Sequence, residues 1–357
     1  MAIKVGILGT GGMANYHAES FRKLKGVRLA SCFDVVADKA RAFAERHGVE
    51  RVAESAQQLC EQVDAVAVVT PDRFHREGAL AALESGRHLL CEKPLTTTLE
   101  EARQVAQAYK RASKRGVIGM VNFSYRRSAA LQKAIAMAKR GELGELRHAH
   151  GSYLQCWVAA PVWGHWSTDT WLWRLQTASG SGGVLGDIGC HLLDLATALT
   201  GQVKRARCLL ATFPKIGKDG KAITSYGGKK LDANDTAVIE LLLENGATVV
   251  LHMTRWAVGH QNQIRLEVHG TSGALEFDLD RSYDQLNLCA GKDVANAQWK
   301  TLELKATPNN WERFIRAIKT KKADQPDILR GAQVQAYLDG CERSAKSGRW
   351  EDIKPWE

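Results

Sequence analysis

The residues best suited to acid–base chemistry in this 357-residue chain are Asp187 and His191, which are four positions apart. Residues at that spacing share one face of a helix, and an imidazole gains and loses protons near neutral pH. We interpret His191 as a proton donor or acceptor, with Asp187 orienting its ring or contacting a substrate hydroxyl. Lys93 is a third candidate, because it precedes Pro94 at the end of an expected strand and a cation there would stabilise a developing alkoxide.

Structural alternatives for these residues stay open. Asp187 could act only as the N-cap of a helix on which His191 packs into a core. A D-x-x-x-H pair is also half of a typical metal site. Asp194 is the one further ligand type close by in the sequence, so we assign no metal. Lys93 taken alone would more often be a surface lysine.

A glycine-rich turn near the amino end could hold an anionic ligand. It follows an expected strand over 3–8 and opens an expected helix. A G-x-G-x-x-A pattern in that position predicts a dinucleotide-binding turn, in which a pyrophosphate faces free N–H groups at the positive end of the helix dipole. An ordinary glycine turn without ligand is the alternative. The residues assigned to the turn are Gly9, Thr10, Gly11, Gly12, Met13 and Ala14.

Asp34 follows a second apolar segment, 27–33. A carboxylate in this position accepts hydrogen bonds from the adenosine ribose and repels a 2′-phosphate. The three residues after it are apolar, and no arginine follows directly. The sequence therefore predicts NAD rather than NADP, although Lys39 and Arg41 could restore some NADP binding.

Alternating strands and helices through the first third predict a doubly wound parallel sheet, an α/β Rossmann arrangement over 1–122. Ligands bind beyond the carboxyl ends of strands in such sheets. Besides the turn and Asp34, the residues assigned to cofactor binding are Thr70, Pro71, His75, Glu92, Lys93 and Asn122.

The pattern changes after residue 122 and predicts an α+β domain over 123–357, built on a large, mostly antiparallel sheet, with the option that the last helix packs back on the first domain. The expected strands are 146–158, 203–213, 236–244, 247–256, 263–269 and 274–279, and the expected helices are 128–140, 186–199, 310–320 and 328–346.

Several motifs occur in a fixed order along the chain. Thr70-Pro71, His75 and Cys91-Glu-Lys-Pro94 form one set, and Trp173-Arg174 with Gly182-Gly-Val-Leu-Gly-Asp-Ile-Gly-Cys-His-Leu-Leu-Asp194 forms another. Together with the segments 122–126 and 141–144, they resemble the Gfo/Idh/MocA oxidoreductases, the group of glucose–fructose oxidoreductase and inositol dehydrogenase. This resemblance implies catalytic roles for Lys93, Asp187 and His191, with His191 as the preferred acid/base. It also implies a homodimer or homotetramer.

Aromatic residues gather in the stretch that leads into the second motif set, over 157–173. Trp157, Trp163, Trp166, Trp171 and Trp173 are five of the ten tryptophans. Such rings stack on the C–H face of a sugar, or else fill a core. The substrate-binding candidates are Lys93, Tyr125, Arg126, His165, Trp173, Arg174, Asp187 and His191.

These observations predict an NAD-dependent oxidoreductase that transfers a hydride between nicotinamide and a ring secondary alcohol of a sugar, sugar derivative or cyclitol. A redox-neutral, NAD-using glycoside-cleaving enzyme is one alternative, and a non-catalytic nucleotide sensor is another. The formal charge of +10 is spread along the chain, so no nucleic-acid partner is expected. No apolar run is long enough to span a membrane. The eight scattered cysteines contain no C-x-x-C pair, which favours reduced thiols in the cytoplasm.

Overall fold

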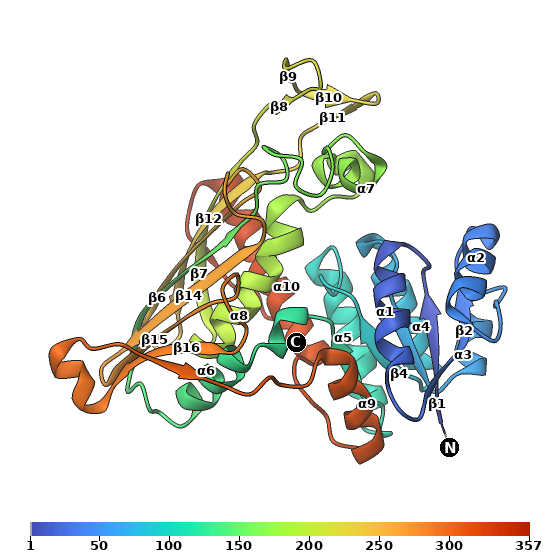
Figure 1. The fold of residues 1–357 in the computed structure, drawn as a ribbon, viewed down its shortest axis with the longest axis horizontal. Coiled ribbons are helices and arrows are strands. Elements are labelled where there is room, and N and C mark those ends of the chain that lie inside the picture. Colours follow the sequence, from blue (N-terminus) through green and yellow to red (C-terminus); the bar gives the residue numbers. More distant parts are fainter. Residues whose placement is uncertain (1) are drawn as a thin grey trace. The chain divides into compact units, whose positions relative to one another are not determined.

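A computed structural model describes residues 2–357, which divide into two compact units (Figure 1). The first unit runs from the amino end to Ser124 and takes in Pro308–Gln335 and Pro355–Glu357. The second consists of Tyr125–Thr307 and Ala336–Lys354. Helix α10 (Ile328–Ser347) therefore contributes its first turns to one unit and the remainder to the other. None of the helices described is both long and apolar enough to cross a bilayer.

The first unit is built on a five-stranded parallel sheet in the order β2-β1-β3-β4-β5. Its central strand β3 is buried along its whole length, as expected where helices cover both faces of a parallel sheet. The strands are β1 (Ile3–Leu8), β2 (Val27–Phe33), β3 (Ala65–Val68), β4 (His88–Cys91) and β5 (Gly119–Val121). The helices are α1 (Gly12–Arg22), α2 (Ala37–His47), α3 (Ala56–Gln62), η1 (Asp72–Phe74), α4 (His75–Glu84), α5 (Leu99–Ser113) and α9 (Asn310–Thr320).

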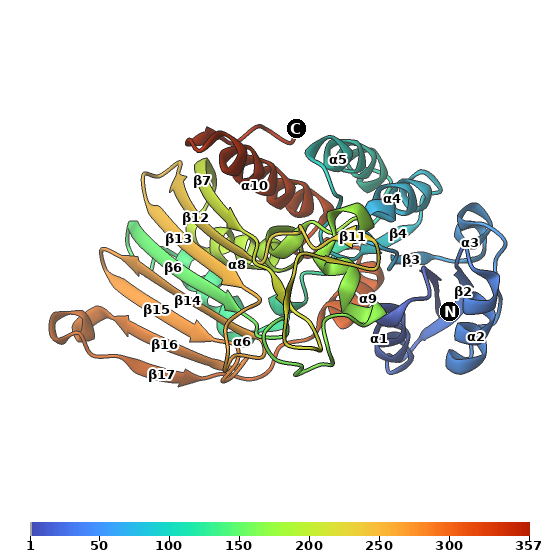
Figure 2. The ribbon, with the colours of Figure 1, turned by 90° about the horizontal axis from the view of Figure 1, so that it is seen from above.

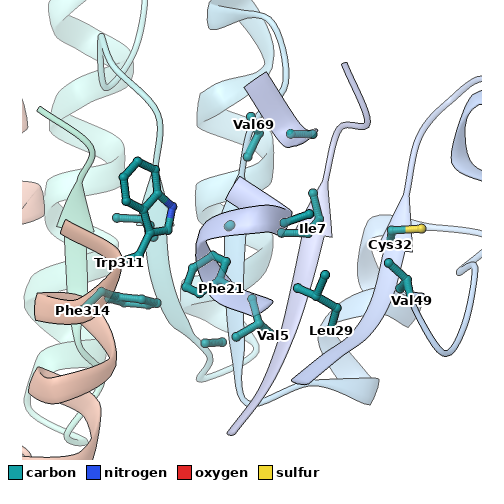
Figure 3. Close-up of a cluster of buried hydrophobic side chains, with 14 of the residues drawn as sticks. Val5, Ile7, Phe21, Leu29, Cys32, Val49, Val69, Trp311 and Phe314 are labelled. Carbon is teal, nitrogen blue, oxygen red and sulfur yellow. The ribbon is translucent and has the colours of Figure 1, made fainter. Parts of the chain in front are cut away.

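The core of this unit joins the two ends of the sequence. Val5 and Ile7 of β1 pack in one buried cluster with Phe21 of α1 and with Trp311 and Phe314 of α9 (Figure 3). Helix α9 begins at a capping box in which Asn309 and Glu312 satisfy each other's backbone N–H groups, an arrangement that stabilises helix starts. The core around the parallel sheet therefore includes large apolar side chains from residues near position 310.

The second unit is built on a nine-stranded sheet in the order β17-β16-β15-β14-β6-β13-β12-β7-β18 (Figure 2). All neighbours are antiparallel except β6 and β13. Buried and exposed residues alternate along β12 and β13, so one face is covered and the other is open. Helices α6 and α8 pack against the covered face. The strands are β6 (Leu146–Leu154), β7 (Val203–Ala211), β12 (Thr236–Leu243), β13 (Thr248–Thr254), β14 (Gln263–Gly270), β15 (Gly273–Asp278), β16 (Gln285–Ala290), β17 (Lys300–Glu303) and β18 (Glu351–Asp352).

Short elements and the remaining helices complete this unit. They are η2 (Ser124–Arg127), α6 (Ala129–Lys139), α7 (Asp169–Leu172), η3 (Trp173–Leu175), η4 (Thr177–Ser179), η5 (Leu185–Gly189), α8 (Cys190–Thr200), β8 (Lys215–Ile216), β9 (Ala222–Ile223), β10 (Ser225–Tyr226), β11 (Lys229–Lys230) and η6 (Gly291–Asn296).

The predicted fold class is confirmed, but two expected elements differ. The strand expected over 146–158 ends at Leu154. The helix expected over 186–199 is a π-helix, η5, followed by the α-helix α8. A π turn needs one extra residue per turn and leaves no signature in an apolar pattern. Strands β16, β17 and β18 were not expected, because they are short and carry many polar residues.

Candidate active site

The glycine-rich turn leaves the carboxyl end of β1, beside the carboxyl end of β3 in the adjacent position of the sheet. Gly9 has φ of +90°, and a Cβ there would lie 2.8 Å from the backbone N of Thr70, so only glycine fits. A Cβ on Gly11 or Gly12 would meet no atom within 4 Å. Helix α1 starts at Gly12 and has no acidic residue in its first turn. The turn is thus open, and its exposed N–H groups suit the pyrophosphate of a dinucleotide.

Asp34 follows β2 and is tied to the same turn. Its Oδ2 accepts hydrogen bonds from the backbone N and the Oγ1 of Thr10, both at 2.9 Å, and its Oδ1 accepts one from Val36 N at 2.9 Å. Partial burial opposes ionisation, but these hydrogen bonds outweigh it and hold the pKa of Asp34 below its usual value. Because a carboxylate has about four acceptor positions, a fixed, charged Asp34 still has room for a ribose hydroxyl.

The His75 side chain contacts the loops that follow β3 and β4. Its ring is fully buried, with Nδ1 2.7 Å from the carbonyl oxygen of Pro94 and Nε2 2.9 Å from that of Thr70. Both ring nitrogens therefore face backbone oxygens of the loops that follow β3 and β4. This arrangement gives His75 a positioning role, and direct contact of His75, Thr70 or Pro71 with a cofactor stays a prediction.

Glu92 is the centre of a buried polar network. Its Oε1 lies 2.7 Å from Nε2 of His17 and accepts a hydrogen bond from Asn122 Nδ2 at 2.6 Å. Trp311 Nε1 donates to His17 Nδ1 at 3.1 Å. Since an indole N–H can only donate, Nδ1 accepts, and Nε2 carries the proton that His17 gives to Glu92. Asn310 Nδ2 completes the network by donating to Asn122 Oδ1 at 3.0 Å.

This network keeps Glu92 charged next to Lys93. Burial alone would raise the pKa of Glu92, but the hydrogen bonds from His17 and Asn122 and the Lys93 charge lower it to about 2. The Lys93 backbone N donates to Glu92 Oε2 at 3.2 Å. Glu92 and Asn122 therefore act on Lys93 and its loop, and whether they touch a cofactor stays a prediction. Sequence reasoning missed His17, Asn310 and Trp311, since nothing in their spacing links them to Glu92.

In the second unit, Asp187 lies inside the π-helix η5, whose N-cap is Val184. The N-cap alternative for Asp187 is therefore wrong. Arg255 Nη2 donates to Asp187 Oδ2 at 2.9 Å, and Arg174 Nε lies 3.6 Å from the same oxygen. Arg255 is fully buried and its guanidinium lies over the ring of Trp157. Sequence reasoning missed Arg255, which comes from the loop after β13.

His191, in the first turn of α8, is buried against aromatic rings. The ring of Tyr125 meets it edge-on with centroids 4.8 Å apart. Tyr153 donates to Asn262 Oδ1 at 2.8 Å, Asn262 Nδ2 donates to the Tyr125 hydroxyl at 2.8 Å, and the two tyrosine hydroxyls lie 2.5 Å apart. Burial and the neighbouring Tyr125 raise the pKa of Tyr153 well above its usual value. This closed cycle of two neutral hydroxyls and the Asn262 amide fixes the tyrosine rings that lie beside His191.

Two further candidates of the second unit are Arg126, which is buried, and Arg174, which lies against aromatic rings. Arg126 is buried and pairs through Nε and Nη2 with both oxygens of Asp194, each at 2.6 Å. A role for Arg126 in substrate binding stays a prediction, and the hydrogen-bonded pair gives Asp194 a structural role. Arg174 lies over the rings of Trp171 and Trp173.

The tryptophan stretch serves mainly as core. Trp157 and Trp166 are buried in one apolar cluster with Leu175, which is the structural alternative noted for this segment. Trp163, by contrast, is partly exposed and stacks on Trp171 with centroids 5.6 Å apart. His165 lies beside this group, with Nδ1 2.8 Å from Ser167 Oγ. Whether Trp173, His165 or the exposed rings contact a sugar stays a prediction.

Comparison with known proteins finds a family match for each of the two units. Residues 3–123 match the model of an oxidoreductase family with an NAD-binding Rossmann fold, and residues 131–276 match the GFO/IDH/MocA C-terminal domain. The chain is 33% identical to D-glucoside 3-dehydrogenase of Escherichia coli, with 97% of this chain and 96% of that protein covered. It is 30% identical to levoglucosan dehydrogenase of Pseudarthrobacter phenanthrenivorans, with 98% of each covered. A solved structure of levoglucosan dehydrogenase in complex with NADH aligns with a TM-score of 0.86 and 27% identity, covering 99% of this chain and 100% of that chain.

Proposed function

Because the chain belongs to the Gfo/Idh/MocA oxidoreductase family, we propose that it is an NAD-dependent dehydrogenase of a ring secondary alcohol in a sugar, sugar derivative or cyclitol. The observation that carries this proposal is the full-length similarity to two sugar dehydrogenases, combined with an open glycine turn and a charged Asp34. Among carbohydrates, glucosides and anhydrosugars are the leading substrates, because they are the compounds named for these two relatives.

The residues of the first unit would hold NAD. Gly11 and Gly12 leave space for the pyrophosphate against the start of α1, and Asp34 would accept the ribose hydroxyls. When bound, NAD supplies the hydride acceptor. The negative charge of Asp34 disfavours the additional 2′-phosphate of NADP.

The residues of the second unit would handle the substrate proton. His191 is proposed as the group that takes the hydroxyl proton as hydride leaves the carbon, since an imidazole titrates in the useful range. Asp187, anchored by Arg255, would bind a substrate hydroxyl or orient His191. The Lys93 ammonium would stabilise the developing alkoxide.

A substrate panel tests the proposal. Purified protein is incubated with NAD or NADP and with polyols, free sugars, glucosides and anhydrosugars, and the reduced cofactor is followed by absorbance. We expect turnover with NAD and at least one carbohydrate. If neither cofactor is reduced by any compound and no dinucleotide binds, the proposal fails. Glycoside cleavage without net NADH would support the redox-neutral alternative instead.

Two further parts of the proposal concern the state of the protein. We place it in the cytoplasm, because all eight cysteines are free and buried and a reducing compartment preserves thiols. We also infer a homodimer or homotetramer, which light scattering of the purified protein would detect as a mass of two or four chains. We further propose domain limits of 1–122 and 123–357, except that residues 308–335 belong with the first domain, which the division into compact units supports.

A further inference from the structure

The open face of the nine-stranded sheet carries a cluster of imidazoles far from Asp187 in sequence. His148 and His150 lie on β6, and Glu267 and His269 lie on the adjacent antiparallel strand β14. In the strand register, Glu267 stands opposite His150, and His269 stands opposite His148. Ala149 on β6, between the two histidines, is fully buried. The four polar side chains therefore share the face that points away from the core.

Three of these side chains already approach the spacing of metal ligands. Nε2 of His150 lies 3.5 Å from Oε2 of Glu267, and Nε2 of His269 lies 3.2 Å from Oε1 of Glu267. One ligand atom from each of the three lies within 4.8 Å of the others. Ligands of a tetrahedral zinc ion, with bonds of about 2.0–2.1 Å, are about 3.3 Å apart. Small side-chain rotations at this open surface would close the remaining difference.

His148 lies beside these three residues, with Nδ1 3.4 Å from Thr248 Oγ1. Its ring centroid lies 5.8 Å from that of His150 and 6.1 Å from that of His269. His252 lies on the same face of the sheet, on the neighbouring strand β13.

One cation stands near the cluster. Arg265 Nη2 lies 3.6 Å from Oε2 of Glu267. However, Arg265 Nε donates to Glu276 Oε1 at 2.6 Å, so the shorter and better-formed pair of this guanidinium is with another carboxylate. Glu267 thus keeps negative charge between two imidazoles, and a divalent cation would be attracted to that position.

We propose that His150, Glu267 and His269 bind one divalent transition-metal ion of the zinc type, with His148 as the fourth ligand. Two or three imidazoles with one carboxylate suit Zn²⁺ rather than Mg²⁺ or Ca²⁺, which prefer oxygen ligands. The ion would connect β6 and β14 in the middle of the sheet (Figure 2), so its role is structural. Sequence reasoning did not find this site, because the two strands that build it are far apart along the chain.

The test uses the full-length protein without a histidine tag, after treatment with a chelator and removal of that chelator. Zinc uptake is measured by titration calorimetry and by elemental analysis after gel filtration, with MgCl₂ as the parallel titrant. The variants are H150Q and E267Q. The matched controls are H260Q, from a loop outside the cluster, and E240Q, an exposed carboxylate on β12.

We expect one Zn²⁺ per chain, at least about tenfold weaker binding in H150Q and in E267Q, and unchanged binding in both controls. Zinc should also raise the thermal unfolding midpoint of the wild type but not of H150Q. The proposal is overturned if no stoichiometric zinc is taken up, if the ligand variants bind zinc as the controls do, if Mg²⁺ binds equally well, or if zinc is taken up only as two chains associate. Because the readout is metal content and not turnover, failure here leaves the proposed dehydrogenase activity untouched.

Discussion

The two groups of candidate site residues, one in each compact unit, are built in different ways. In the first unit, the anion-binding turn and Asp34 come from one continuous βαβ segment, and hydrogen bonds within that segment fix them. In the second unit, Asp187 is held by Arg255 from the loop after β13. His191 packs against Tyr125 and Tyr153, which come from other parts of the chain. The residues proposed to bind the cofactor therefore form a local motif, whereas those proposed to transfer the proton depend on the completed second unit. Substitutions in the two groups should separate cofactor binding from chemistry.

The largest separation is expected for His191→Asn. Loss of the acid/base group should lower kcat by about 10³-fold, within the range typical of general acid–base catalysis. NADH binding should persist, because the turn and Asp34 lie in the other unit. Steady-state kinetics and NADH fluorescence titration measure the two effects, with His260→Asn as the control. A kcat within tenfold of wild type would exclude His191 as the acid/base.

Arg255→Gln should affect both stability and chemistry. Removing one partner of a buried ion pair typically lowers the unfolding free energy by about 3–5 kcal/mol. The expected loss is smaller here, because water reaches part of the Asp187 side chain. Denaturant unfolding gives the stability. Arg255→Lys should recover part of kcat if the cation positions Asp187. Equal kcat losses in both variants would argue against that role, and Arg174→Gln, at a more exposed site, should have the smaller effect on stability.

Glu92→Gln tests the buried network of the first unit. The pKa of Glu92 is lowered from 4.5 to about 2 in the folded protein, so its contribution to stability is present above about pH 4.5 and is lost as the pH falls toward 2. At pH 7 the substitution should lower the unfolding free energy by up to about 3 kcal/mol, and the difference from wild type should vanish in acid. Urea unfolding at several pH values measures this. The exposed Glu100→Gln should show neither effect.

The smallest effect is expected for Asp34→Asn, which keeps the shape of the side chain and removes its charge. Without the repulsion of the 2′-phosphate, the ratio of kcat/KM for NADP to that for NAD should rise about tenfold, or roughly 1.4 kcal/mol. Thermal stability should fall slightly, because the amide oxygen can still accept from Thr10, but the amide nitrogen cannot accept from Val36 N. An unchanged ratio would mean that other groups, such as Lys39, set the cofactor preference.

The same contrast explains what could be predicted from sequence. Helix α9 has the bounds expected from apolar periodicity and end signals, because those patterns are local. The glycine turn and Asp34 could also be predicted, because both belong to one short sequence motif. The pairs His17–Glu92 and Asp187–Arg255 were not, because a hydrogen bond between positions 75 or 68 residues apart depends on sheet order. The π turn around Asp187 likewise follows from packing.

Helix α9 contributes to the core of the first unit but is synthesised near the end of the chain, and this order affects folding during translation. Phe21 and His17 leave the ribosome early, but their partners Phe314 and Trp311 are synthesised almost three hundred residues later. The nascent nucleotide-binding region must therefore wait, with part of its interior uncovered, until most of the chain has been translated. A truncated product ending before Asn310 would lack these partners, which makes it a natural substrate for chaperones or proteases.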